Sequence, residues 1–300
     1  MIREKKQQSG PLLEVDFYPT FADGRRMPGR APRTKRTTAE QAKYNRQQAI
    51  KQLIRKINTN FDNTDYLMSP TYEQKYAPAT AEQARRDMVN YLRRVKTRRA
   101  SALKEIEAEL AELPDKPALR KRRERLQAER DKLSAPFKYC YVIEEIAYRT
   151  GSRAGQSNYH FHLFLTGGLS RRELEELWPH GMRTNVDRYQ PERFGPEAAA
   201  KYMCKDPRGS KRFVCSRNMD KPSPPKVKDG HISKRGVELL ARQRVDDAEY
   251  WERRYKGYTF VRCYARYNEY NGHWYVSAVM YRKDAGAPPP WNIDSWIDDP

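Results

Sequence analysis

The chain has 300 residues, which is enough for one domain of ordinary size with extensions or for two small domains. Only 38% of the residues are hydrophobic, and the formal net charge is +20, from 59 lysines and arginines against 39 aspartates and glutamates. A charge of this sign attracts polyanions, so nucleic acid is the favoured partner, with a solubilising surface or a binding protein without chemistry as the alternatives. There is no apolar run of membrane-spanning length and no signal-peptide pattern at the N-terminus, so we expect a cytoplasmic protein with no membrane partner.

The four cysteines are widely spaced and include no Cys-x-x-Cys pair: Cys140, Cys204, Cys215 and Cys263. This spacing disfavours a structural zinc site. It fits reduced thiols in a cytoplasm.

The first 50 residues are expected to form a basic arm followed by a helix. Residues 1 to about 40 mix arginines, among them Arg30 and Arg33, with glycine and proline, a composition that resists regular structure. We expect this part to be loosely ordered, either as an arm that follows phosphates or as a disordered tail. From Thr38, a residue type suited to an N-cap, the pattern becomes helical up to about Asn58.

A short strand and a long helix are expected next. Residues 65–72 have a strand pattern that Pro70 interrupts, because proline cannot donate to a sheet ladder. Thr80 is placed to cap a long helix, whose apolar residues at helical spacing should face a core: Met88, Tyr91, Leu92 and Val95. The opposite side carries arginines that are candidates for contacts with a nucleic-acid backbone: Arg85, Arg86, Arg93, Arg94, Arg98 and Arg99.

Residues 100–134 are expected to form a helical hairpin that stands out from the body. The helical spacing of apolar residues continues to Leu113, and the two prolines of residues 114–117 predict a turn. A second stripe follows at Leu119, Leu126 and Leu133, so two antiparallel helices should meet along a narrow apolar seam. Self-association, a DNA contact and a contact with a host protein are all open as its role.

The remainder of the chain favours strands with short helices between them. Ser170 is placed to cap a short helix that runs to Trp178, and Pro196 is placed to open a helix over residues 196–206. Residues 221–230 read as a linker, and Asn271-Gly272 predicts a β-hairpin within residues 257–282. The expected strands before the linker are residues 137–146, 159–166, 183–189 and 211–217.

The pattern His160-Phe161-His162 is the sharpest candidate for chemistry. Successive residues of a strand point to opposite faces, so both imidazoles emerge on one side and Phe161 faces the core. Two imidazoles at this spacing can bind one divalent metal, or they can be histidines with purely structural hydrogen bonds. If the preceding strand pairs beside them, Glu144 could complete the ligand set, and such a set suits Mg²⁺ or Mn²⁺.

Tyr202 and Lys205 form the second candidate pair. They are three residues apart in an expected helix and therefore share one face. A tyrosine hydroxyl can attack a phosphodiester when a metal polarises the phosphate, and Lys205 could stabilise that phosphate. The alternative is a tyrosine that packs under the sheet and a lysine that is a surface charge.

The order of these elements resembles the HUH endonuclease superfamily, in particular the single-tyrosine rolling-circle replication initiators of phage and plasmid type. In that family a strand with His-hydrophobic-His holds the metal and a later helix carries Tyr-x-x-Lys, whose tyrosine is the nucleophile. The resemblance covers about residues 57–220 and puts Glu144 at the third metal ligand. It puts Thr71 and Tyr72 in the first motif region, where we expect DNA contacts, although Pro70 departs from the pattern. The chain has no Gly-x-x-x-x-Gly-Lys-Ser/Thr motif, so we expect no fused helicase domain.

The resemblance implies an α+β fold, with a central, mainly antiparallel sheet and flanking helices. The protruding helical hairpin expected from the sequence pattern is longer than a minimal nicking domain of this family requires. One sheet face should present the histidines beside the Tyr202 helix. The implied division is a basic N-terminal arm and helix over residues 1–50, a nicking domain over 51–220 with the hairpin inserted at about 100–134, and a linker, β-hairpin and tail over 221–300.

The implied reaction is the nicking of single-stranded DNA at a replication origin. Tyr202 would form a 5′-phosphotyrosine link and leave a free 3′-hydroxyl, and the same chemistry in reverse would rejoin the strands. The cofactor would be Mg²⁺ or Mn²⁺. The partners would be origin DNA and a host helicase and polymerase in the bacterial cytoplasm.

Three alternatives stay open. A single-tyrosine transposase shares the same core, and a conjugative relaxase uses related chemistry. A non-enzymatic basic protein that binds nucleic acid would leave the histidines with structural roles. The aromatic residues Tyr264, Tyr267, Tyr270 and Trp274 could stack on bases, or they could form the core of the C-terminal hairpin.

Overall fold

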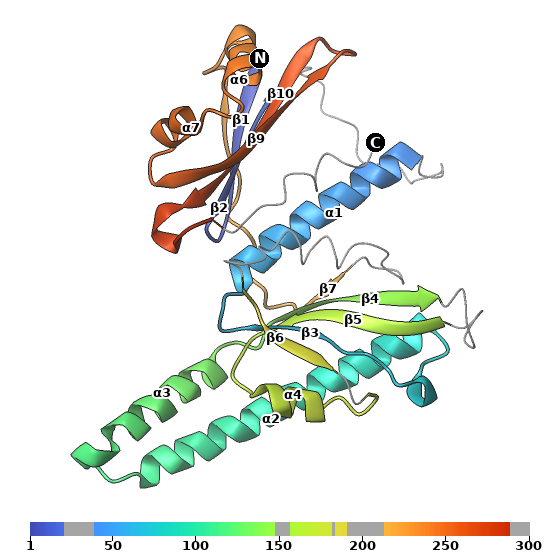
Figure 1. Cartoon of the computed structure of the whole chain (residues 1–300), viewed down its shortest axis with the longest axis vertical. Coiled ribbons are helices and arrows are strands. Elements are labelled where there is room, and N and C mark those ends of the chain that lie inside the picture. The colour runs from blue at the N-terminus through green and yellow to red at the C-terminus, as the bar shows by residue number, and fades with distance from the viewer. Residues whose placement is uncertain (21–38, 148–156, 182–183, 191–212, 289–300) are drawn as a thin grey trace. The chain divides into compact units, whose positions relative to one another are not determined.

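A computed structural model describes residues 1–20, 39–147, 157–181, 184–190 and 213–288. They form an α+β structure of two compact units, and each unit contains one five-stranded antiparallel sheet (Figure 1). The first unit is built from both ends of the chain, Met1–Thr59 and Asp220–Pro300, and the second from the middle. The expected α+β class with antiparallel strands is confirmed, but a single central sheet was expected and the described residues form two.

The first unit has the strand order β8-β1-β2-β10-β9. Trp251, Val237 and Leu240 pack with apolar residues of β2 and β10 in one core. Its elements are β1 (Ile2–Ser9), β2 (Leu12–Pro19), α1 (Ala39–Asn60), β8 (Lys226–Asp229), α6 (Lys234–Gln243), α7 (Ala248–Arg254), β9 (Tyr258–Asn268), β10 (His273–Arg282) and the 3₁₀ turn η4 (Lys283–Ala285).

The N-terminal residues differ from the loosely ordered arm that their composition suggested. Strands β1 and β2 form a hairpin inside the first sheet, and β2 pairs with β10 so that Val15 lies opposite Ala278. Alternate residues of β2, among them Val15 and Phe17, are buried. The partner strand comes more than 250 residues later in the chain, so this pairing is decided by tertiary contacts and not by local composition. Arg30 and Arg33 lie outside the described residues.

The expected C-terminal hairpin is confirmed, whereas the expected linker is more ordered than predicted. Gly272 has a positive φ of 65° and its N–H donates to Asn268 at 2.8 Å, which closes the turn between β9 and β10. Within the expected linker, β8 pairs with β1, and Arg3 forms a 2.7 Å ion pair with Asp229. Helices α6 and α7 were not predicted, although Ser233 caps α6 through its side chain.

Replacement of Gly10 by alanine should destabilise the first unit. Gly10 turns the chain between β1 and β2 with φ of +51°, and an added Cβ would lie 2.1 Å from the carbonyl oxygen of Asn58. We expect the free energy of unfolding to fall by about 2–3 kcal/mol, as measured by urea denaturation. Gly230 is a matched control, because its φ is +71° but a Cβ there would meet no atom within 4 Å. Equal stability of Gly10→Ala and Gly230→Ala would contradict the steric argument.

The second unit has the strand order β6-β3-β5-β4-β7. One face of this sheet carries Phe161, Leu163 and Tyr141, which pack with Met88 and Tyr91 of α2 in one apolar core. Its elements are β3 (Tyr66–Ser69), η1 (Gln74–Tyr76), α2 (Ala81–Glu112), η2 (Pro117–Leu119), α3 (Arg120–Ser134), β4 (Tyr139–Ala147), β5 (Ser157–Leu165), α4 (Arg171–Glu176), β6 (Asn185–Arg188) and β7 (Val214–Cys215).

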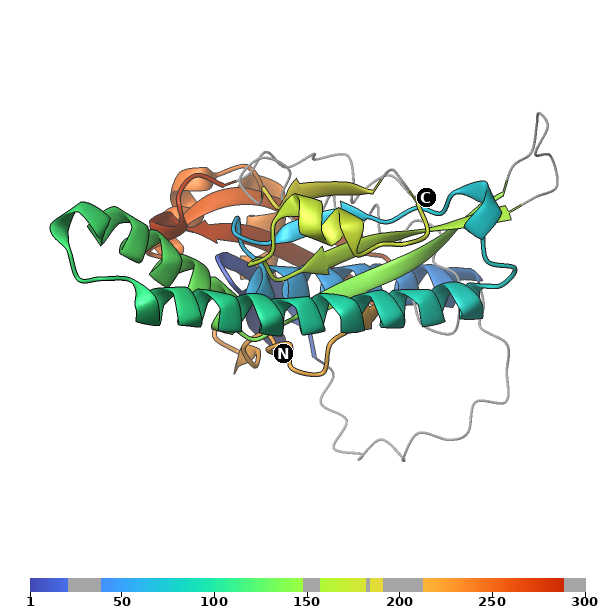
Figure 2. The same ribbon diagram turned by 90° about the horizontal axis from the view of Figure 1, so that it is seen from below.

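The helical hairpin is confirmed and consists of the second half of α2 together with α3. Figure 2 follows α2 along its length, with α3 folded back beside its second half. Thr80 caps α2 by accepting a hydrogen bond from the Gln83 N–H at 3.2 Å, as the sequence indicated. Leu126 and Leu133 are the buried residues of α3, which fits the narrow apolar seam. Among the helices of the described residues, none combines the length and apolar character needed to cross a membrane.

Candidate metal centre

Two adjacent strands place Glu144, His160 and His162 on one sheet face. Strands β4 and β5 pair antiparallel, with Glu144 directly opposite His160 and Val142 opposite His162. Because side chains alternate along a strand, the two histidines and the glutamate share the face opposite to Phe161, which is fully buried in the core. The strand pairing on which the expected third ligand depended is therefore present.

The three ligand atoms touch one another. The Nε2 atoms of His160 and His162 are 3.0 Å apart, and Oε2 of Glu144 lies 2.9 Å from the first and 3.0 Å from the second. The group could hold a metal ion. His162 is only 2% exposed, so its side chain is held in place by the packed residues around it.

The chemistry of these donors fits a divalent cation. Burial lowers the pKa of both imidazoles, which Glu144 opposes, so the neutral form that binds metals is favoured. A neutral imidazole carries at most one proton on Nε2, and an ionised carboxylate carries none. These protons cannot turn all three contacts among the two Nε2 atoms and Oε2 into hydrogen bonds, whereas a cation bound between the three atoms would satisfy all of them. The Nδ1 atom of His160 is buried and has no hydrogen-bond partner in the described part of the chain.

The segment after β3 runs along the other side of His160. The Phe161 N–H donates to the Pro70 carbonyl at 3.0 Å, and Thr71 forms an isolated bridge with His160. Pro70 thus ends β3 as a regular strand, as predicted, but does not end its contact with β5. Thr71 therefore lies beside the metal-ligand group, and its role in DNA contact stays a prediction.

The burial of Tyr72 corrects the expectation that this residue contacts DNA. Its side chain is 4% exposed, packs against Phe161 and Trp178, and donates to the Asp87 carboxylate on α2 at 3.0 Å. Burial and Asp87 raise the pKa of this phenol. Tyr72 is therefore a packing residue that fixes the segment beside His160, and not a free contact for DNA.

Two hydrogen bonds that hold this segment in place were not predicted from the sequence. The Trp178 indole N–H donates to the Thr71 carbonyl at 3.0 Å, and the Glu73 N–H donates to the His180 carbonyl at 2.8 Å. Both residues follow α4, whose capping box at Ser170 and Glu173 is readable in the sequence. Because these hydrogen bonds join residues that are far apart in the chain, no local sequence pattern predicts them.

Of the six candidate arginines of α2, three are exposed and three contact other parts of the protein. The exposed ones are Arg85, Arg86 and Arg93, and the engaged ones are Arg94, Arg98 and Arg99. Arg99 is 3% exposed, and its guanidinium donates to the carbonyls of Gly167, Lys132, Leu133 and Ala135. The expectation that it contacts DNA is corrected by this burial. Arg98 bridges Glu173 and Glu105, and Arg94 donates to the Leu177 carbonyl at 3.1 Å. Arg93 is exposed and therefore remains a candidate for a contact with the phosphate backbone of DNA.

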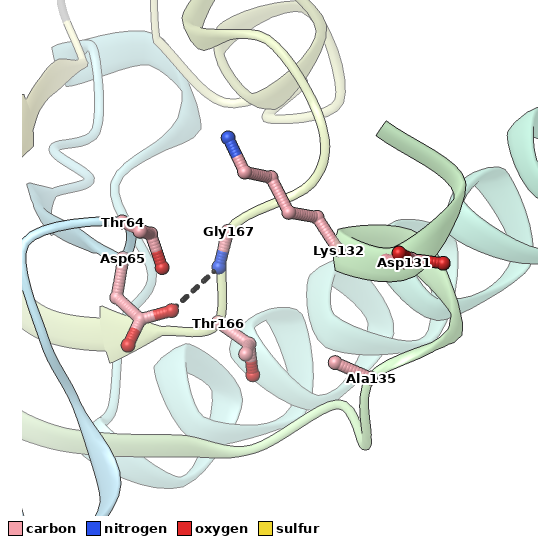
Figure 3. A pocket seen from close by; sticks show the side chains of 7 residues that line it. All are labelled: Thr64, Asp65, Asp131, Lys132, Ala135, Thr166 and Gly167. Atoms are coloured by element: carbon pink, nitrogen blue, oxygen red, sulfur yellow. Dashed lines mark hydrogen bonds between the residues drawn. The ribbon is translucent and has the colours of Figure 1, made fainter. Parts of the chain in front are cut away.

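A cavity of about 290 Å³ lies where the hairpin joins the sheet, and Figure 3 shows its lining. The Gly167 N–H donates to the buried Asp65 carboxylate at 2.9 Å, and burial raises the pKa of that carboxyl. The cavity is formed by the end of β5 away from the histidines and by the end of α3. Its residues are Thr64, Asp65, Asp131, Lys132, Ala135, Thr166 and Gly167.

The expected nucleophile and its partner, Tyr202 and Lys205, lie outside the described residues, as does the helix expected to carry them. Comparisons of the chain with protein-family models, with curated proteins and with solved structures find no match. The case for a function therefore rests on the metal-ligand group and on the sequence.

Proposed function

We propose that the protein is a metal-dependent nickase of single-stranded DNA that initiates rolling-circle replication. The observation that carries this proposal is the convergence of Glu144, His160 and His162 at about 3 Å on one sheet face. The net charge of +20 supports a polyanionic substrate. Glu144, His160 and His162 would hold Mg²⁺ or Mn²⁺, which when bound polarises the scissile phosphate and stabilises its developing negative charge.

The bond changes are assigned to Tyr202. Its hydroxyl oxygen attacks the scissile phosphorus and loses its proton, and the bond from phosphorus to the 3′ oxygen breaks as that oxygen gains a proton. The products are a 5′-phosphotyrosine link and a free 3′-hydroxyl, from which a host polymerase extends while a host helicase opens the duplex. Lys205 stabilises the phosphate. The reverse reaction rejoins the strands.

Replacement of Tyr202 by phenylalanine should abolish the covalent protein–DNA adduct and leave DNA binding within about twofold, because only the attacking oxygen is removed. The protein is incubated with single-stranded fragments that tile the DNA encoding it, with Mn²⁺ or EDTA, and run on a denaturing gel. Tyr270→Phe is the matched control, since Tyr270 is fully exposed in the first unit.

The outcomes separate the candidate functions. An adduct that survives SDS, needs Mn²⁺ and needs Tyr202 supports nicking, and the mapped site distinguishes a replication origin from a transposon end or a transfer origin. Binding that resists EDTA, with no adduct on any fragment, would instead support a basic binding protein with structural histidines.

A further inference from the structure

Two cysteines that are far apart in the sequence face each other in the second unit. Cys140 on β4 and Cys215 on β7 occupy directly opposite positions of an antiparallel pair. Their sulfur atoms are 3.0 Å apart, and no disulfide joins them. This distance is closer than an ordinary contact of unbonded sulfur atoms, so little movement separates the pair from a covalent bond.

The backbone at this position has the geometry that a disulfide requires. The neighbouring pair is joined by a hydrogen bond from the Ser216 N–H to the Tyr139 carbonyl at 2.9 Å, so Cys140 and Cys215 form a non-hydrogen-bonded pair. At such a pair the Cα atoms are about 4.5 Å apart and the side chains lie close. A disulfide accepts Cα separations of about 4.4–6.8 Å. No rearrangement of the strands is needed to close the bond.

The two thiols differ in their access to solvent. Cys140 is fully buried, whereas Cys215 is half-buried. An oxidant in solution would therefore reach Cys215 first, with Cys140 held against it as the resolving thiol. Cys263 lies in the other unit, where burial raises its pKa to about 12 and makes it a poor nucleophile. Cys204 lies outside the described residues.

We propose that Cys140 and Cys215 are a redox modification site that closes to an intrachain disulfide on exposure to hydrogen peroxide. The Cys215 thiolate attacks one peroxide oxygen, the O–O bond breaks, and a sulfenic acid and one water form. The Cys140 sulfur then attacks the Cys215 sulfur, the S–O bond breaks, and a second water leaves. Two thiols are oxidised and one peroxide is reduced to two waters. A cellular thiol reductant restores the pair.

The position of the pair gives the disulfide a structural consequence. Cys140 lies on the strand of Glu144 and, four residues away, on the same face of it. Strand β7 is only two residues long and pairs with β4. A disulfide would fix this short edge strand covalently to the strand that carries a metal ligand. The proposal does not depend on nicking activity.

The test treats the full-length protein with hydrogen peroxide and maps non-reduced peptides by mass spectrometry. We expect a peptide pair linked through Cys140 and Cys215, a loss of two of the four thiols, and reversal by dithiothreitol. The bond closes a loop of about 75 residues, so the melting temperature of the oxidised protein should rise by about 5–10 °C.

Cys215→Ser and Cys140→Ala should both lose the linked peptide and the thermal shift, whereas Cys263→Ser should keep both. Two separate variants are used in case one of the substitutions disturbs folding. The peptide map of the wild-type protein tests the proposal even if both variants misfold. A map that links other cysteines, links two chains, or shows Cys215 oxidised to sulfinic acid without a disulfide would overturn the proposal.

Discussion

Replacement of His162 by alanine is expected to abolish divalent-metal binding by the protein. His162 is the most buried of the three candidate ligands, and its Nε2 lies 3.0 Å from both partner atoms. Its removal leaves one imidazole and one carboxylate, which is too few ligands for a stable site. We expect the affinity for Mn²⁺ to fall by about 100-fold or more, as measured by isothermal titration calorimetry.

The same variant separates metal binding from the proposed reaction. On the nickase proposal, His162→Ala also removes the SDS-resistant adduct while salt-sensitive DNA binding persists, because the phosphate contacts come from other residues. His162→Gln tests whether the lost volume disturbs the sheet, since it fills the position without an imidazole. His273→Ala is the matched control, because His273 lies in the first unit. If both His162 variants bound Mn²⁺ as tightly as the wild-type protein, the metal-ligand assignment would be wrong and the histidines would have structural roles.

Replacement of Arg99 by methionine is expected to destabilise the second unit strongly. The guanidinium is 3% exposed and is the shared donor to four carbonyls at the base of the hairpin and at the end of β5. Methionine fills much of the space but leaves these buried acceptors without a donor. We expect the free energy of unfolding of the second unit to fall by about 3–4 kcal/mol.

Urea denaturation followed by circular dichroism measures the change. Arg93→Met is the matched control, because it makes the same substitution six residues earlier on the same helix, at an exposed position. Its effect should stay within about 0.5 kcal/mol. Arg99→Lys should not restore stability, since one ammonium group cannot reproduce the planar set of donors. Equal stability of the Arg99→Met and Arg93→Met proteins would show that the hydrogen bonds of Arg99 are not needed.

Several parts of the fold and the metal-ligand group follow from the sequence by itself. A strand period of two puts His160 and His162 on one face, whatever the strand pairs with. The helical period and the prolines of residues 114–117 specify the hairpin of α2 and α3, and Asn271-Gly272 specifies the turn between β9 and β10. These features are local, because the residues that decide them are a few positions apart.

Other features were decided only by the tertiary structure. Strand β2 is ordered by pairing with β10 from the far end of the chain, and Cys140 meets Cys215 only because β7 pairs with β4. Arg99 looked like one more residue of a basic helix face, yet the hairpin and the end of β5 close over it. In each case the partner lies tens to hundreds of residues away. Local propensity and charge say which side chains are available, and long-range packing decides which of them are buried, paired or left for a ligand.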